Sequence, residues 1–330
     1  MTPKRLPPRR AAAPARPAVP ATRAVAARLL RSWLFVPGDS ERKQEKALAS
    51  AADAVILDLE DSVAITQLAA ARACVGELLR SRRSGGGPQV WVRVNAPSSG
   101  LMELDLAAVF AGGAPDGIVL PKVSGAGEVV DVARQLGVLE GSLGLGVGAT
   151  RLLVIATETP EGVLSLPLYP AVLGGASVPP ERIAGLTWGA EDLSTALGAL
   201  AQRDDTGALT FTFQYARTQC LLAAAALVTQ AIDGVCTDFR DPARLQRELD
   251  AARRDGFSGK LAIHPDQIAA INAAFAPTAA EREHAQRVVA AFELAPSAGV
   301  VNLDGRMIDR PHLLQAQRIL AITEHERDRT

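Results

Sequence analysis

The chain contains few aromatic residues and almost no excess charge, and both shortages argue against a nucleic-acid-binding protein. Aromatic residues make up 4% of the 330 residues, too few for a typical surface that stacks bases. The formal net charge is −1, whereas proteins that bind phosphate backbones normally carry a basic excess. We therefore expect small-molecule partners and no nucleic acid.

Cysteines and long apolar runs are also scarce. Cys74, Cys220 and Cys236 form no CxxC pair and have no histidine at zinc-ligand spacing. We interpret them as reduced, small apolar residues of a cytoplasmic protein. No uncharged apolar run reaches the length of a membrane span, so we expect no membrane partner. The 48% of hydrophobic residues instead predicts a large buried core.

The first 30 residues differ in composition from the rest of the chain. They are rich in Ala, Pro and Arg and contain no acidic residue, since the first carboxylate is Asp39. Their prolines prevent a continuous amphipathic helix. We expect residues 1–30 to be a disordered basic extension. An organelle transit peptide is the alternative, which the arginines favour and the prolines and scarcity of serine disfavour.

From residue 31 onward, short apolar runs alternate with longer segments of helical periodicity. Such alternation predicts an α/β fold with a parallel sheet, and eight strands favour a closed (β/α)8 TIM barrel over residues 31–268. The remainder, 269–330, reads as a C-terminal helical extension or lid. The eight predicted strands are Trp33–Val36, Ala54–Leu59, Val90–Asn95, Gly117–Val123, Leu152–Thr157, Ile183–Trp188, Gly234–Thr237 and Lys260–Ile263.

Polar residues follow nearly every predicted strand. Because the carboxyl ends of barrel strands meet at one rim, where such enzymes hold their active sites, this pattern predicts an enzyme. Acidic residues dominate the set, and several acids converge without repulsion only when a cation lies among them. The residues are Asp39, Asp58, Glu60, Asp61, Arg93, Asn95, Lys122, Glu158, Glu191, Asp192, Asp238 and His264.

The chemistry of these residues indicates a hard divalent cation. Without a cysteine or histidine cluster the ligands are oxygens, which Mg²⁺ prefers and Mn²⁺ accepts. Glu158 and Asp192 follow adjacent strands, so we expect them to be the metal ligands. The alternative for Asp192 is a helix cap, because Glu191 and Asp192 directly precede a helical segment.

The remaining rim residues allow more than one interpretation. Arg93 lies in an apolar strand and needs an anion, either a structural carboxylate or, as we favour, a substrate oxygen. Lys122 reads as a salt-bridged lysine rather than a Schiff-base nucleophile. Asp58 and Glu60 share a strand face, and Glu60 either binds a metal-bound water or pairs with Lys122. His264 precedes a proline and reads as structural.

Nine motifs, in this order, resemble the citrate lyase β-subunit-like branch of the HpcH/HpaI aldolase family. The resemblance covers about residues 31–326. The motifs are Ser32–Asp39 (SWLFVPGD), Ala54–Asp61 (AVILDLED), Trp91–Asn95 (WVRVN), Val119–Val123 (VLPKV), Glu158–Gly162 (ETPEG), Gly189–Leu193 (GAEDL), Ile232–Asp238 (IDGVCTD), Gly259–Pro265 (GKLAIHP) and Asp304–Asp309 (DGRMID).

The resemblance implies a Mg²⁺-dependent carbon–carbon lyase that cleaves or forms a 3-hydroxyacyl-CoA, such as malyl-, citramalyl- or citryl-CoA, with an acyl-CoA and an α-keto acid as the other partners. It implies Glu158 and Asp192 as metal ligands, Glu158 and Arg93 in substrate binding, and Asp309 as a catalytic carboxylate that the C-terminal segment supplies, in several members from a neighbouring subunit. A homotrimer or hexamer would allow this. A malyl-CoA thioesterase or malate-synthase-like activity, or the β subunit of a citrate lyase complex, are the alternatives.

Overall fold

Eight parallel strands close into a barrel, as the alternating sequence pattern predicts. The computed structural model describes residues 29–82, 87–175 and 178–327; the predicted disordered extension lies outside them, apart from its last two residues. The first strand pairs with the last, with Trp33 opposite Leu261, so the sheet has no edge. The strands are β1 (Ser32–Pro37), β2 (Ala54–Asp58), β3 (Gln89–Arg93), β4 (Gly117–Leu120), β5 (Arg151–Ile155), β6 (Ile183–Thr187), β7 (Gln230–Asp233) and β8 (Gly259–Ala262).

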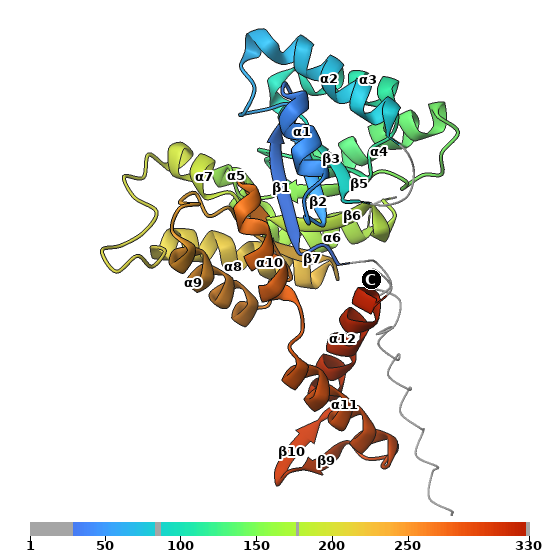
Figure 1. The fold of residues 1–330 in the computed structure, drawn as a ribbon, viewed down its shortest axis with the longest axis vertical. Helices are drawn as coiled ribbons and strands as arrows, with labels where there is room; N and C mark the ends of the chain where they lie inside the picture. The colour runs from blue at the N-terminus through green and yellow to red at the C-terminus, as the bar shows by residue number, and fades with distance from the viewer. Residues whose placement is uncertain (1–28, 83–86, 176–177, 328–330) are drawn as a thin grey trace, which may run out of the picture.

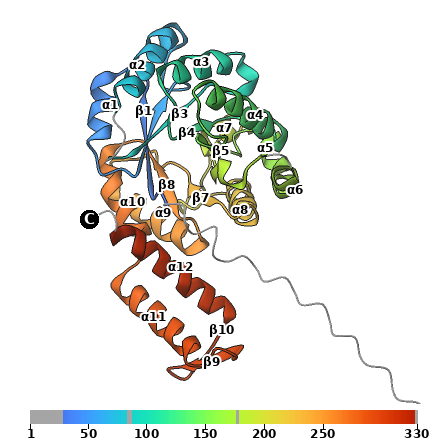
Figure 2. The ribbon, with the colours of Figure 1, turned by 90° about the vertical axis from the view of Figure 1, so that its right-hand side faces the viewer.

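Helices surround the barrel and bury its outer surface (Figures 1 and 2). Their apolar faces and the outward residues of the strands form one large core, while the inward residues form a separate one. This double burial explains why the strands read as almost continuous apolar runs. The helices are α1 (Glu41–Leu48), α2 (Leu68–Ser81), α3 (Met102–Gly112), α4 (Ala126–Ser142), α5 (Pro160–Ser165), α6 (Tyr169–Gly175), α7 (Ala190–Leu197), α8 (Phe211–Ala226), α9 (Pro242–Asp255) and α10 (Ile268–Phe275).

Two tryptophans fill the barrel interior below the rim that the carboxyl ends of the strands form. The rings of Trp33 and Trp91 meet edge to face with their centroids 4.8 Å apart. Gly117 on the neighbouring strand makes room for them, because a Cβ there would lie 2.1 Å from a carbon of the Trp91 ring. Together with Ile56 and Leu153 they close the interior. The barrel interior is therefore a packed core, and the chemistry belongs at the rim that the carboxyl ends of the strands form.

The seventh strand lies four residues before its predicted position. The sequence favours Gly234–Thr237, whose Val and Cys suit a strand better than the polar ends of Gln230–Asp233. The helix before it, α8, ends at Ala226, and Val228 adopts a left-handed conformation with φ 56°. This turn ends the helix, and the strand begins two residues later, at Gln230.

The C-terminal segment forms a small unit with its own core. It consists of α11 (Ala279–Glu293), the hairpin β9 (Val300–Leu303) and β10 (Arg306–Asp309), and α12 (Arg310–Arg327). Asp304 and Gly305 both have positive φ, 54° and 79°, as a tight two-residue hairpin requires. The segment projects away from the barrel, and its hairpin lies at the far end (Figures 1 and 2). The domain boundary after residue 268 stays a prediction.

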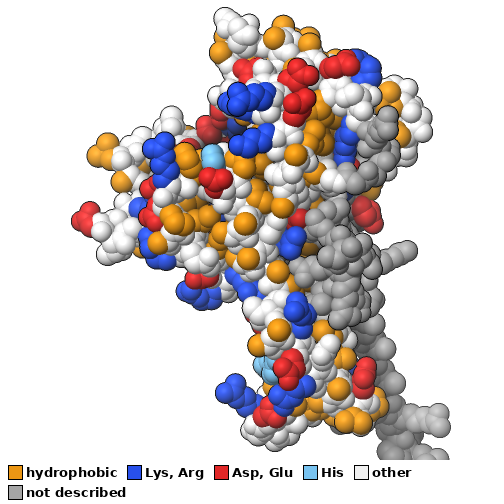
Figure 3. Space-filling view, viewed as in Figure 1, with side chains coloured by type: hydrophobic (Ala, Val, Ile, Leu, Met, Phe, Trp, Pro, Cys, Tyr) orange, Lys and Arg blue, Asp and Glu red, His pale blue; other side chains and the backbone are white. Residues whose placement is uncertain are grey.

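The surface carries no strongly segregated charge on the face in view. Lys and Arg side chains are interspersed with Asp and Glu over the barrel and the C-terminal segment (Figure 3), in keeping with the net charge of −1. Within the described ranges, no helix combines the length and the apolar character needed to cross a membrane.

Candidate active site

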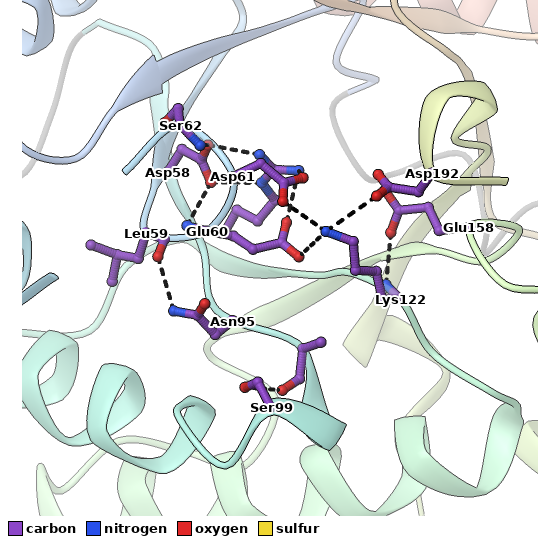
Figure 4. A network of polar contacts seen from close by, with 12 residues as sticks. Asp58, Leu59, Glu60, Asp61, Ser62, Asn95, Ser99, Lys122, Glu158 and Asp192 are labelled. Atoms are coloured by element: carbon purple, nitrogen blue, oxygen red, sulfur yellow. Dashed lines mark hydrogen bonds and ion pairs between the residues drawn. The ribbon is translucent and has the colours of Figure 1, made fainter. Parts of the chain in front are cut away.

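Seven of the predicted rim residues meet above the packed interior of the barrel: Asp58, Glu60, Asp61, Arg93, Lys122, Glu158 and Asp192. Asp58 and Arg93 end the neighbouring strands β2 and β3, opposite each other in the register. Glu158 lies just beyond β5, and Asp192 lies in the first turn of α7, after β6. Lys122 follows β4 and lies between the two groups (Figure 4). The carboxyl ends of five strands thus contribute to one cluster.

Arg93 and Asp58 form a buried, two-bonded ion pair at the floor of the cluster. Arg93 Nε donates to Asp58 Oδ1 at 2.6 Å and Nη2 donates to Oδ2 at 2.7 Å. Burial alone would raise the pKa of Asp58, but the charge and hydrogen bonds of Arg93 outweigh it and lower that pKa. The ring of Phe35 lies below the guanidinium, 4.8 Å from centroid to Cζ. Arg93 therefore has the structural carboxylate that we considered as the alternative to a substrate oxygen.

Asp58 also shapes the turn that carries the next two acids. Its Oδ1 accepts from the backbone N–H of Glu60 at 3.0 Å, and its Oδ2 accepts from that of Ser62 at 3.1 Å. These bonds place Glu60 over the guanidinium, where Arg93 Nη1 lies 2.9 Å from Glu60 Oε2. This contact is an ion pair without hydrogen-bond geometry, and among the described residues Glu60 Oε2 has no hydrogen-bond partner. Burial, the largest influence, raises the pKa of Glu60 to about 7 despite the neighbouring cations.

Lys122 is salt-bridged, in agreement with the interpretation from the sequence. Its Nζ donates to Glu60 Oε1 at 2.6 Å and to Asp61 Oδ1 at 2.8 Å, and lies 3.4 Å from Asp192 Oδ1. Burial alone would lower the pKa of Lys122, but its bonds to Asp61 and Glu60 raise it above the ordinary value. An amine held protonated in this way is a poor nucleophile for Schiff-base chemistry.

Glu158 is a deeply buried carboxylate, and the positive charge of Arg93 does not offset the effect of its burial. Its side chain is 4% exposed, and its Oε2 accepts from the backbone N–H of Lys122 at 2.7 Å. Gly189 provides space for it, since a Cβ there would lie 2.6 Å from Glu158 Cγ. Burial, then the charges of Asp192 and Glu60, raise the pKa of Glu158 well above its ordinary value.

The pair Glu158 and Asp192 fits a hard divalent cation. The two carboxylates lie beside each other in Figure 4, and a buried acid with a raised pKa gains most from a cation at that place. Among the described residues no group of three or more His, Cys, Asp or Glu side chains is arranged to hold a metal. Two carboxylates agree with Mg²⁺, which usually takes one or two and keeps its other positions for water or substrate.

Comparison with known proteins identifies the family. The family model described as HpcH/HpaI aldolase/citrate lyase matches residues 31–265. The chain belongs to this family. It is 36% identical to (3S)-malyl-CoA thioesterase of Cereibacter sphaeroides over 89% of this chain and 94% of that one. It is also 36% identical to the citrate lyase subunit beta of Escherichia coli, over 90% and 94% of the two chains.

A solved structure has a similar fold over most of the chain. CitE from Mycobacterium tuberculosis, in complex with magnesium, acetoacetate and coenzyme A, is 32% identical. The match covers 89% of this chain and 98% of that one, with a TM-score of 0.70. These relatives confirm the family resemblance of the motifs, and the chain is an enzyme of the carbon–carbon lyase type.

Within this HpcH/HpaI family member, two other polar rim residues have structural partners. His264 caps the turn after β8, where its Nδ1 accepts from the backbone N–H of Asp266, and its ring stacks on Phe239 at 4.6 Å. Asn95 donates to Asp105 Oδ2 at 2.8 Å and to the carbonyl of Leu59 at 2.9 Å. His264 therefore makes structural contacts of the kind that the sequence analysis expects.

The structure does not bring Asp309 to the rim of its own barrel. Asp309 ends β10, in the hairpin at the far end of the C-terminal segment (Figures 1 and 2). There it contacts Nδ1 of His312, and this hydrogen bond is the main cause that lowers the pKa of Asp309. The segment's own small core, not the barrel, fixes this position.

Three contributors to the site escaped the sequence analysis. Phe35 lies under Arg93, Gly189 makes room for Glu158, and Thr157 Oγ1 accepts from the N–H of Gly189 at 3.1 Å and so joins the two ligand-bearing loops. A signal existed only for Phe35, which lies two residues after the inward-facing Trp33 and hence on the same strand face.

Proposed function

We propose that this chain is a Mg²⁺-dependent lyase that cleaves or forms a 3-hydroxyacyl-CoA such as malyl-CoA, citramalyl-CoA or citryl-CoA. The products of cleavage are an acyl-CoA and an α-keto acid. One observation carries the proposal: the buried, under-neutralised carboxylate of Glu158 lies beside Asp192 at the open rim, in a chain whose relatives include a magnesium- and coenzyme A-bound CitE. Glu158 and Asp192 would hold the metal, with Mn²⁺ as a substitute.

Cleavage of such a substrate needs a base, a stabilised oxyanion and a proton source. The 3-hydroxyl loses its proton, the C2–C3 bond breaks, and its electron pair forms the thioester enolate, which is then protonated at carbon. A Mg²⁺ ion, when bound, polarises the ketone and carboxylate oxygens of the keto acid. Arg93 offsets negative charge on a substrate oxygen through Nη1, the nitrogen that its bonds to Asp58 leave for the rim.

The Asp58 pair makes Arg93 a rigid donor. Two bonds and the ring of Phe35 fix the plane of the guanidinium, so that little reorganisation accompanies substrate binding. Glu60 stands in front of Nη1 with a pKa of about 7, and its protonated form gives up the ionic attraction that holds it there. A substrate carboxylate or oxyanion then takes its place.

Asp309 would reach the site from a neighbouring subunit. It is remote from its own rim, at the end of β10 in the projecting C-terminal segment. That segment exposes large apolar side chains, with Met307 77% and Leu294 89% exposed. A homotrimer or hexamer would bury these residues and close one barrel with the hairpin of another. Asp309 would then act as the base for the hydroxyl or at the enol carbon.

A screen of thioesters tests this function. The purified protein is mixed with acetyl- or propionyl-CoA and glyoxylate, pyruvate or oxaloacetate, with and without Mg²⁺, and the thioesters are followed by mass spectrometry. We expect a new 3-hydroxyacyl-CoA, only with metal, and no product from Glu158→Ala although that variant folds. Thioesters that stay unchanged with Mg²⁺ in every combination would contradict the proposal.

The same assay separates two related outcomes. Identity of 36% to a malyl-CoA thioesterase favours hydrolysis of the thioester as the second candidate. Release of free CoA together with a free hydroxy acid, detected with a thiol reagent, marks that activity. A β subunit of a citrate lyase complex would instead leave free CoA thioesters untouched and act only on an acyl group delivered by a carrier protein.

A further inference from the structure

Among the described residues, Lys122 is the cation that contacts both the acids after β2 and the proposed metal ligand Asp192. On one side its Nζ bonds to Glu60 and Asp61, which follow β2. On the other side it lies 3.4 Å from Asp192 Oδ1, on the residue proposed as a metal ligand (Figure 4). Arg93 is held by Asp58 and also contacts Glu60 and Asp61, so Lys122 shares with Arg93 the neutralisation of the acids above that pair.

The backbone at Lys122 is held in a conformation that a lysine rarely adopts. Its φ is 51°, in the left-handed region that favours glycine. Its N–H donates to Glu158 Oε2 at 2.7 Å, so the same residue touches the second proposed ligand. Strained residues of this kind persist where the surrounding structure fixes them, and they gather at functional sites. The strain here places an ammonium group among the carboxylates that a metal needs.

We propose that Lys122 is a positioning residue that competes with the divalent cation for Asp192 and holds Glu60 and Asp61 away from it. Metal binding then requires the ammonium to leave Asp192 and to remain with the two acids beyond β2. The free enzyme binds the metal weakly, and the oxygens of the substrate supply the missing affinity. This inference rests on the metal site of the proposed function.

The direction in which Mg²⁺ affinity changes when Lys122 is replaced separates this role from a purely structural one. If Lys122 only organised the acids, its loss would loosen the ligands and weaken metal binding. If it competes, its loss removes a positive charge from beside the metal and tightens binding. Coulomb repulsion between a divalent ion and an ammonium a few ångströms away predicts about a tenfold effect or more, even when solvent screens the pair.

Calorimetric titration of the metal-free protein with Mg²⁺ at pH 8.5 makes the measurement. We expect Lys122→Met to bind Mg²⁺ about ten times more tightly than the wild type. Lys122→Arg, which keeps the charge, and Lys46→Met, an exposed lysine on α1, should bind as the wild type does. Oxaloacetate should tighten Mg²⁺ binding to the wild type more than to Lys122→Met.

Each result decides between the two proposals. Unchanged or weaker Mg²⁺ binding by Lys122→Met overturns the competition, and so does tighter binding by Lys46→Met. A wild type that shows no saturable Mg²⁺ binding, with or without oxaloacetate, instead overturns the metal site of the proposed function. Thermal unfolding checks each variant, and Lys122→Gln carries the same expectation if the methionine variant does not fold.

Discussion

Asp233 and Glu158 are both buried carboxylates at the carboxyl ends of barrel strands, but they differ in the number of hydrogen-bond donors around them. Asp233 ends β7 and accepts from Trp188 Nε1 at 2.8 Å, Arg217 Nε at 2.9 Å and Lys260 Nζ at 3.0 Å. Glu158 follows β5 and accepts one described hydrogen bond, from the backbone of Lys122. Both side chains are almost fully removed from solvent.

The pKa values of the two acids move in opposite directions. Burial alone would raise the pKa of Asp233, but the charges of Lys260 and Arg217 outweigh it and lower that pKa. For Glu158, burial and the charges of Asp192 and Glu60 outweigh the charge of Arg93, so its pKa rises. A charge that is fully neutralised stabilises the fold, whereas one left without compensation marks a place for a ligand.

We expect the largest change in stability when Asp233, the acid with three hydrogen-bond donors, is replaced. Asp233→Asn leaves Lys260 and Arg217 without their shared anion in the interior, and we expect the free energy of unfolding to fall by about 3–5 kcal/mol. Urea unfolding at pH 7 measures the change. Asp131→Asn, which breaks an exposed ion pair with Arg134, is the matched control and should stay within about 0.5 kcal/mol of the wild type. Equal losses in both variants would remove the contrast between the two acids.

The uncompensated acid should behave in the opposite way. Glu158→Gln removes a charge that the fold disfavours, so the metal-free variant should unfold at a higher temperature than the wild type at pH 8. Its affinity for Mg²⁺ should fall by more than about 100-fold, since the loss of an outer-shell partner alone costs 10- to 100-fold. Scanning calorimetry with and without Mg²⁺ measures both. A variant less stable than the metal-free wild type would show that Glu158 is compensated after all.

Much of the barrel could be predicted because its strands are short apolar runs separated by helices. The exception, β7, shows the limit: Gln230 and Asp233 are polar because they bond to Ser258 and Lys260, contacts that lie far away in the chain. Strand propensity therefore favoured the following residues, Gly234–Thr237, which instead form a loop. Tertiary partners overrode the local pattern.

The sequence predicts which residues belong to the site better than it predicts which of them contact one another. Strand alternation and register place Asp58 beside Arg93, since the inward-facing Ile56 and Trp91 lie two residues before them. The three carboxylates around Lys122 depend on side-chain directions that no periodicity encodes. Asp309 is remote because a separate small core positions its hairpin, and the motif alone carries no information on that geometry.

Glu60 is intermediate between Asp233, whose pKa is lowered, and Glu158, whose pKa is raised well above its ordinary value. Its replacement gives the smallest predicted change in stability. Its pKa in the folded protein is about 7, above the ordinary value of 4.5, so the unfolded chain ionises it at a lower pH than the native state does. Native Glu60 therefore costs stability progressively from about pH 4.5 to about pH 7, and the cost is complete above that range. Glu60→Gln removes this cost but leaves Arg93 and Lys122 with fewer partners, so the net gain should be only about 1–2 kcal/mol. Urea unfolding of variant and wild type from pH 5 to pH 8.5 should show their difference growing up to pH 7 and then levelling. A difference that shrinks as the pH rises would mean that Arg93 and Lys122 neutralise Glu60 as completely as Lys260 and Arg217 neutralise Asp233.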